Sequence, residues 1–116
     1  MNLCENSNFL FEIKKGNSIQ CDSTNSIIIN FNGTTTSYKI QEFLIFQRKV
    51  NSINVLDMLY DLSDNSDCKL IEASKGNFSK KMTICEIVQL RELLNGTKFA
   101  LTLNSMLSQV LHTQYA

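Results

Sequence analysis

Residues 26–51 read SIIINFNGTTTSYKIQEFLIFQRKVN, and this stretch decides the fold. The β-branched run 27–31 predicts a central strand that is covered on both faces. Asn32-Gly33 predicts a tight hairpin turn, because both residues tolerate a positive φ. The Thr-rich run 34–40 predicts the return strand, and residues 41–50 carry apolar side chains at helical spacing. The stretch therefore predicts a β-hairpin followed by a helix that covers it.

The same order of elements returns in residues 69–95. Residues 69–74 and 78–83 predict two strands, and the Lys-Gly-Asn sequence at 75–77 predicts the turn between them. Thr83-Ile84-Cys85-Glu86 matches a capping box, in which the Thr hydroxyl and the Glu carboxylate each accept a backbone N–H. A helix is expected to follow from Ile84.

The two stretches can be aligned residue by residue. When Ile40 is set on Ile84, Glu42 falls on Glu86 and Val50 falls on Leu94. We therefore predict one α+β domain over residues 1–116, with an internal pseudo-repeat of roughly 26–51 and 69–95. The two β-hairpin–helix units are expected to share one antiparallel sheet, with the helices packed on one face.

Further elements lie outside the repeat. Residues 9–21 predict an amino-terminal hairpin in which Phe9, Phe11 and Ile13 alternate along one apolar face. Asn54 predicts the N-cap of a short helix, and residues 61–67 predict an exposed acidic linker.

Asn95-Gly96 is expected to end the helix that begins at Ile84, with glycine in the left-handed cap. Residues 97–111 then predict a last helix, with Phe99, Leu103, Met106, Leu107 and Val110 on one side. A short strand over residues 97–103 is the alternative, because Phe99, Leu101 and Leu103 also alternate.

The composition limits the classes of protein to which the chain can belong. Eleven basic and eleven acidic residues cancel, so a general electrostatic attraction to nucleic acid is disfavoured. No apolar run approaches the length of a membrane span, and the amino-terminal residues lack the pattern of a secretory signal. We expect a cytoplasmic protein with reduced cysteines, with neither a membrane nor a nucleic-acid partner.

The cysteines do not predict a metal site. Cys4 and Cys21 lie 17 residues apart, as do Cys68 and Cys85, whereas zinc ligands usually come in close pairs such as C-x-x-C. The single histidine, His112, stands near the carboxyl end. Buried thiols that pack as small hydrophobic groups are the favoured interpretation, and no cofactor is expected.

No other motif predicts catalysis or ligand binding. Cys85 stands where a helix amino terminus lowers a thiol pKa, but no histidine base is near it in sequence. A calcium loop is disfavoured because Ser66 replaces its turn glycine, although loop positions are filled by Asp61, Ser63, Asn65 and Glu72. The doublets Lys14-Lys15 and Lys80-Lys81 are too few to form a phosphate track. The sequence predicts no catalytic, cofactor-binding or metal-binding residue.

The chain resembles an uncharacterised family of small bacterial proteins. The resemblance rests on the segment from Gln20-Cys21 to Phe31-Asn32, on Glu42-Phe43 and on residues 86–94. Members of that family often carry a C-x-x-C pair before the first long strand. Here Cys21 would be the first cysteine, but Thr24 stands at the position of the second. The family has no assigned activity, so the resemblance implies none.

Two functional hypotheses follow from these observations. The first is a non-enzymatic interaction or regulatory module that forms a homodimer through a sheet edge or the terminal helix. The alternative is a small-molecule or metal-binding domain with a pocket between sheet and helices. Residues 1–25 and 97–116 are the segments that the repeat does not explain, so a site, if the protein has one, is to be sought there first.

Overall fold

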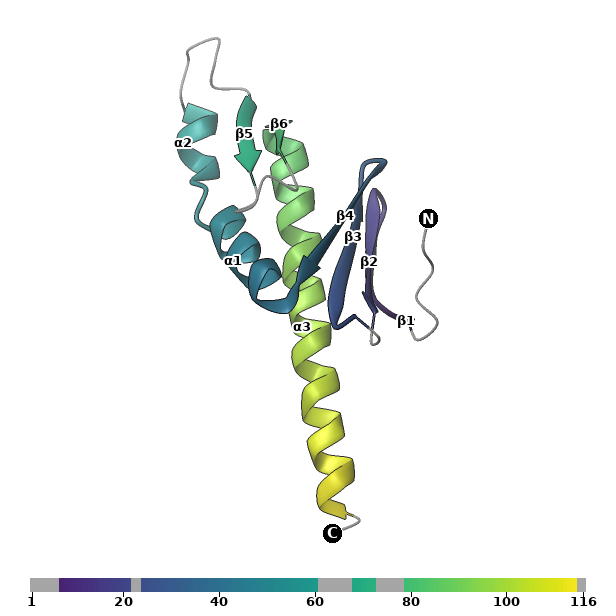
Figure 1. Ribbon diagram of the computed structural model, residues 1–116. Coiled ribbons are helices and arrows are strands. Elements are labelled where there is room, and N and C mark those ends of the chain that lie inside the picture. Colours follow the sequence, from purple (N-terminus) through teal and green to yellow (C-terminus); the bar gives the residue numbers. More distant parts are fainter. Residues whose placement is uncertain (1–6, 22–23, 61–67, 73–78, 115–116) are drawn as a thin grey trace.

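The computed structural model describes residues 7–21, 24–60, 68–72 and 79–114 (Figure 1). The elements follow one another as β1 (Ser7–Ile13), β2 (Gly16–Cys21), β3 (Ser26–Phe31), β4 (Thr34–Lys39), α1 (Ile40–Asn51), α2 (Val55–Tyr60), β5 (Cys68–Glu72), β6 (Ser79–Thr83) and α3 (Ile84–Gln114). Antiparallel strands with helices packed on them confirm the predicted α+β class. The predicted turn at 75–77 and the predicted linker at 61–67 lie outside the described residues.

The first four strands form one antiparallel sheet in the order β1-β2-β3-β4. Asn32 and Gly33 have φ values of 51° and 85°, which confirms the predicted hairpin turn between β3 and β4. Strand β3 is an inner strand, as predicted. It buries Ile27, Ile29 and Phe31 under the helices, while Ile28 is only half-buried on the other side. The prediction that both faces are covered was therefore wrong, since helices pack on one face.

Strand β1 departs from simple alternation. Its pairing with β2 shifts between Phe9 and Phe11, which leaves Leu10 as an extra residue in the ladder. Such a bulge changes which side chains face the core. Leu10 is buried, Phe11 packs against the core, and Phe9 is exposed. The predicted apolar face of Phe9, Phe11 and Ile13 is wrong for Phe9.

The second hairpin does not join the first sheet. Strands β5 and β6 pair only with each other among the described strands. Helix α3 contacts β1 and β2 as well as β6, and in Figure 1 it runs between the two sheets. Because α3 occupies the space between them, the strands of the two hairpins cannot pair. The prediction of one shared sheet was therefore wrong, although Ile71 and Met82 still join the common core.

Helix α3 is continuous from Ile84 to Gln114, so the predicted end at Asn95-Gly96 was wrong. The alternative strand over residues 97–103 was wrong as well. Gly96 does not cap a helix end. It allows α3 to pack closely on β1, because a Cβ there would lie 2.3 Å from the ring of Phe11. Asn95 accepts hydrogen bonds from the side chains of Gln47 and Asn51 on α1. From positions inside α3, Gly96 thus allows contact with β1 and Asn95 holds the helix to α1.

The two repeat units begin their helices in the same way. Ile40 and Ile84 are the first helical residues of α1 and α3. Glu42 accepts the backbone N–H of Lys39, and Glu86 accepts the backbone N–H of Thr83. Only in α3 does the preceding side chain complete the box, since the Thr83 hydroxyl accepts from the backbone of Glu86. The short helix α2 also starts as predicted, with Asn54 accepting the backbone N–H of Asp57.

Glu86 gives the fold a pH dependence. The backbone N–H of Thr83 is the main cause that lowers the pKa of Glu86, and the Thr83 hydroxyl, Lys80 and Lys15 lower it further, while partial burial opposes them. A carboxyl group with a lowered folded-state pKa stabilises the fold above its unfolded pKa. That contribution disappears as the pH falls through the lower folded value.

We therefore expect Glu86→Gln to reduce the free energy of unfolding at pH 7 by at most about 1 kcal/mol, because solvent screens the exposed carboxylate. The difference from the unmodified protein should vanish in acid. Urea titrations at several pH values measure it, with Glu92→Gln as a control that removes one exposed charge from the same helix. An equal loss at all pH values would contradict the assignment.

Candidate functional site

The carboxyl-terminal half of α3 leaves the body of the molecule. Thr97 is fully buried, Ala100 and Leu101 pack against the core, and every described side chain from Thr102 to Met106 is exposed. We call residues 102–114 the stem. Figure 1 shows it extending past the sheet and past α1. The radius of gyration is 16.1 Å, against about 13 Å for a compact domain of this length.

An apolar stripe runs along one face of this helix, and its last residue, Met106, also lines a hollow. Phe99, Leu103 and Met106 are 68%, 43% and 57% exposed, and their spacing of four and three residues places them on one face. We call these three residues the outer stripe. Large apolar side chains exposed together on one helix face are unfavourable in water, and such patches are typical of interaction surfaces.

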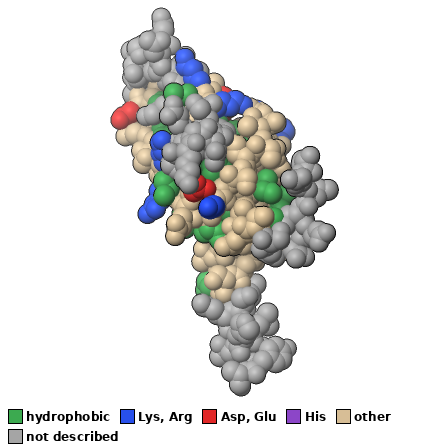
Figure 2. All heavy atoms as spheres, in the orientation of Figure 1, with side chains coloured by type: hydrophobic (Ala, Val, Ile, Leu, Met, Phe, Trp, Pro, Cys, Tyr) green, Lys and Arg blue, Asp and Glu red, His purple; other side chains and the backbone are tan. Residues whose placement is uncertain are grey.

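No charge accompanies the outer stripe. Residues 99–116 contain no Asp, Glu, Lys or Arg. Solvent-facing protein surfaces normally carry about 25–35% charged residues, and solvated helices carry them on the outer face. In Figure 2 the described part of the stem shows no blue or red side chains on the face in view. The composition of the stem therefore suits contact with another neutral surface.

A hollow of about 1150 Å³ lies beside the root of the stem. Lys98 is its only charged residue, and the lining comes from β1, β2, the start of α1 and the middle of α3: Asn8, Phe9, Gln20, Ile40, Leu44, Lys98, Leu101, Thr102, Asn104, Ser105 and Met106. The alternative hypothesis, a small-molecule or metal-binding domain, predicted a pocket between sheet and helices.

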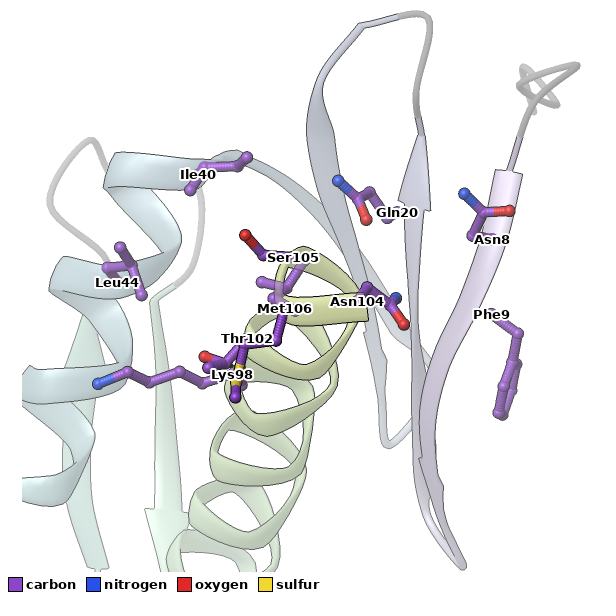
Figure 3. A pocket seen from close by; sticks show the side chains of 11 residues that line it. Asn8, Phe9, Gln20, Ile40, Leu44, Lys98, Thr102, Asn104, Ser105 and Met106 are labelled. Atoms are coloured by element: carbon purple, nitrogen blue, oxygen red, sulfur yellow. Dashed lines mark hydrogen bonds between the residues drawn. The ribbon is translucent and has the colours of Figure 1, made fainter. Parts of the chain in front are cut away.

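The lining residues of the hollow do not converge. Figure 3 shows Ile40 and Leu44 on one side of α3, with Asn8 and Gln20 on the other, and the ring of Phe9 points away from Ile40. Small-molecule sites usually enclose the ligand and direct a few polar groups at it. The hollow is larger than most such sites, and its polar groups are spread around it. This geometry fits a surface contact better than an enclosed ligand.

The structure brings together residues from both lysine doublets. Lys15, in the β1–β2 turn, and Lys80, on β6, both act on the carboxylate of Glu86 at the start of α3. The side chain of Asn32 donates to the same carboxylate at 3.0 Å, and its backbone N–H donates to the carbonyl of Lys15. These contacts join two hairpin turns to the helix start, so we assign them a structural role.

The cysteines are only partly as predicted. Cys21 is disulfide-bonded, so the prediction of a reduced buried thiol was wrong for this residue, and the other half of that disulfide is not among the side chains described. It lies at the end of β2, opposite Ser7 of β1. Cys85 is free, as predicted, but it is exposed in the first turn of α3, so the prediction of a buried thiol was wrong for it. Cys4 and the side chains of Cys68 and His112 lie outside the described residues.

Metal and membrane sites were searched only in the part of the chain that the structure describes. There, no group of three or more His, Cys, Asp or Glu side chains could hold a metal ion. Asp61, Ser63 and Asn65, which fill positions of the disfavoured calcium loop, lie outside the described residues, as does the side chain of Glu72. No described helix is both long enough and apolar enough to cross a bilayer.

The stem lies in residues 97–116, one of the two segments that the repeat left unexplained, but its uncharged character was not noticed in the sequence. The signal that was overlooked is the absence of charge after Lys98, which is visible in the sequence. Which residues of this uncharged helix face solvent depends on which of them the rest of the fold covers.

Comparison with models of known protein families, with curated proteins and with solved structures finds no match. The resemblance to a family of small bacterial proteins therefore stays a prediction. The functional conclusion rests on the geometry of the outer stripe and the stem.

Proposed function

We propose that this protein is a non-enzymatic interaction module that forms a homodimer through the outer stripe and the stem of α3. One observation carries the proposal: an uncharged helix leaves the body and exposes Phe99, Leu103 and Met106 on one face. Self-association would remove that apolar area from water. A two-fold contact brings like surfaces together, so a surface without charge meets its copy without repulsion.

A small-molecule or metal-binding role is the second candidate, supported by the hollow beside Lys98. It is the weaker of the two, because the polar groups around the hollow do not converge. A cytoplasmic location and the lack of a nucleic-acid partner stay predictions from the sequence.

Native mass spectrometry tests both candidates at once. For the protein purified without chelators, we expect twice the 13.2 kDa chain mass with nothing added. A mass above that of the bare chains would support the ligand-binding alternative. A monomer at every concentration tested would overturn the homodimer.

Two matched variants locate the contact on α3. Leu103→Glu places a charge in the outer stripe and should raise the dimer dissociation constant by about 100-fold, equivalent to about 3 kcal/mol. Asn104→Glu adds the same charge at the next position, which is exposed and faces away from the outer stripe, and should leave the dimer intact. Equal loss of the dimer in the two variants would contradict the proposal.

A further inference from the structure

Two Asn-Gly pairs occur in the sequence, and the structure places them in different surroundings. Asn32-Gly33 forms the turn between β3 and β4, whereas Asn95-Gly96 lies inside α3. Asparagine followed by glycine is the pair most open to deamidation, because glycine has no side chain to hinder its backbone nitrogen. The two pairs are equal in sequence, so only their surroundings can separate them.

Deamidation starts within the chain. The backbone nitrogen of the glycine attacks the side-chain Cγ of the asparagine and forms a carbon–nitrogen bond. The side-chain amino group leaves with the glycine N–H proton as ammonia, so a cyclic imide remains. Water then hydrolyses the imide to aspartate or isoaspartate, and no oxidant or reductant takes part. The attack requires the nitrogen to come close to Cγ in the right direction, which the backbone must permit.

The turn at Asn32 permits this approach. Phe31 pairs with Thr34, so the strand residues close the ladder and the N–H of Gly33 is not part of it. Both turn residues are exposed, and among the described residues no atom beyond its chain neighbours lies within 4 Å of a Cβ built on Gly33. Glycine also accepts a wide range of backbone angles. The peptide between Asn32 and Gly33 can therefore rotate without disrupting the sheet.

The peptide between Asn95 and Gly96 is held in place. It belongs to the interior of α3, so its rotation would break hydrogen bonds of the helix on both sides. The side-chain oxygen of Asn95 accepts hydrogen bonds from Gln47 at 2.9 Å and from Asn51 at 2.7 Å. Gly96 packs against the ring of Phe11. The attacking nitrogen and the side chain that it must reach are thus both fixed.

We propose that Asn32 is a site of spontaneous deamidation and that Asn95 is protected from it. The amide nitrogen of Asn32 donates to a carboxylate oxygen of Glu86 at 3.0 Å. Deamidation replaces this donor with a carboxylate, so two negative charges face each other at the start of α3 and repel. An isoaspartate product also adds a backbone carbon to a two-residue turn. The modification therefore weakens the contact that joins the β3–β4 turn to α3.

Peptide mapping by mass spectrometry after incubation of the full chain at neutral pH tests the site. After reduction, trypsin separates the two pairs into the fragments 16–39 and 92–98, because cleavage follows Lys and Arg. We expect fragment 16–39 to lose its amide at least about 10-fold faster than fragment 92–98. The ratio should approach one when the chain is incubated in urea, and Asn32→Gln should abolish the fast reaction. Equal rates in the folded protein, or a fast reaction that persists in Asn32→Gln, would overturn the proposal.

A double-mutant cycle tests the consequence for the fold. Asn32→Asp, which reproduces the charge of the product, should lower the urea midpoint of unfolding, and Glu86→Gln should remove most of that shift. The same shift in both backgrounds would contradict the repulsion between the two carboxylates. Neither experiment depends on the proposed homodimer, because the outer stripe begins at Phe99 and native mass spectrometry reports on the dimer separately.

Discussion

Replacing Phe46 with alanine is expected to lower the free energy of unfolding by about 3–5 kcal/mol. Phe46 is 1% exposed on α1, and its ring stacks on Tyr38 of β4 with centroids 5.3 Å apart. The substitution removes buried apolar area, leaves a cavity and ends an aromatic contact between helix and sheet. The phenol of Tyr38 would lose the burial that raises its pKa.

Guanidinium denaturation at one fixed protein concentration measures this loss, because the stability of a dimer depends on concentration. Ile45→Ala is the matched control. It shortens the neighbouring side chain, which is 45% exposed, and should cost less than about 1 kcal/mol. Equal losses for the two variants would contradict the assignment of Phe46 to the core.

Gly16→Ala is expected to cost about 3 kcal/mol, at the upper end of the range for overpacking. A Cβ at Gly16 would lie 2.2 Å from the backbone oxygen of Asn30 and 3.2 Å from a methyl carbon of Leu93. The backbone of Asn30 cannot move away easily, because β3 is held between β2 and β4. The added methyl group therefore disturbs both the sheet and its contact with α3.

Gly33→Ala provides the control for this second variant. It adds the same methyl group in open space, and its cost comes only from the positive φ of 85°. We expect a loss of about 1 kcal/mol there, measured in the same denaturation series. If Gly16→Ala lowers the free energy of unfolding less than Gly33→Ala does, the strands move to make room for the methyl group and the prediction is wrong.

Local signals in the sequence were sufficient for most elements. Asn32-Gly33 predicted the hairpin turn because the turn itself requires residues that accept a positive φ. Ile40 and Ile84 were aligned correctly, although Ile40 was expected to end the return strand and instead begins α1. In both units a carboxylate two positions later accepts the preceding backbone N–H. Asn54 was likewise recognised as a cap. Each of these signals acts within four residues of the chain.

The errors arose where distant residues meet. Gly96 looked like a helix end, because glycine often ends helices, but the ring of Phe11 needs the space that a Cβ would fill. Phe9 was expected on the inner face of β1, but the bulge at Leu10 turns it outward. The disulfide at Cys21 was not expected either, because reduced thiols were predicted from the lack of a secretory signal.

The sequence by itself determined the α+β class, the two hairpin–helix units and an uncharged end of the chain, because composition and short-range periodicity carry that information. Only the tertiary structure decided that α3 passes unbroken between two separate sheets and leaves the body as a stem. The physical reason is burial: the same apolar helix is core where Phe11 and the strands cover it, and an open surface where they do not.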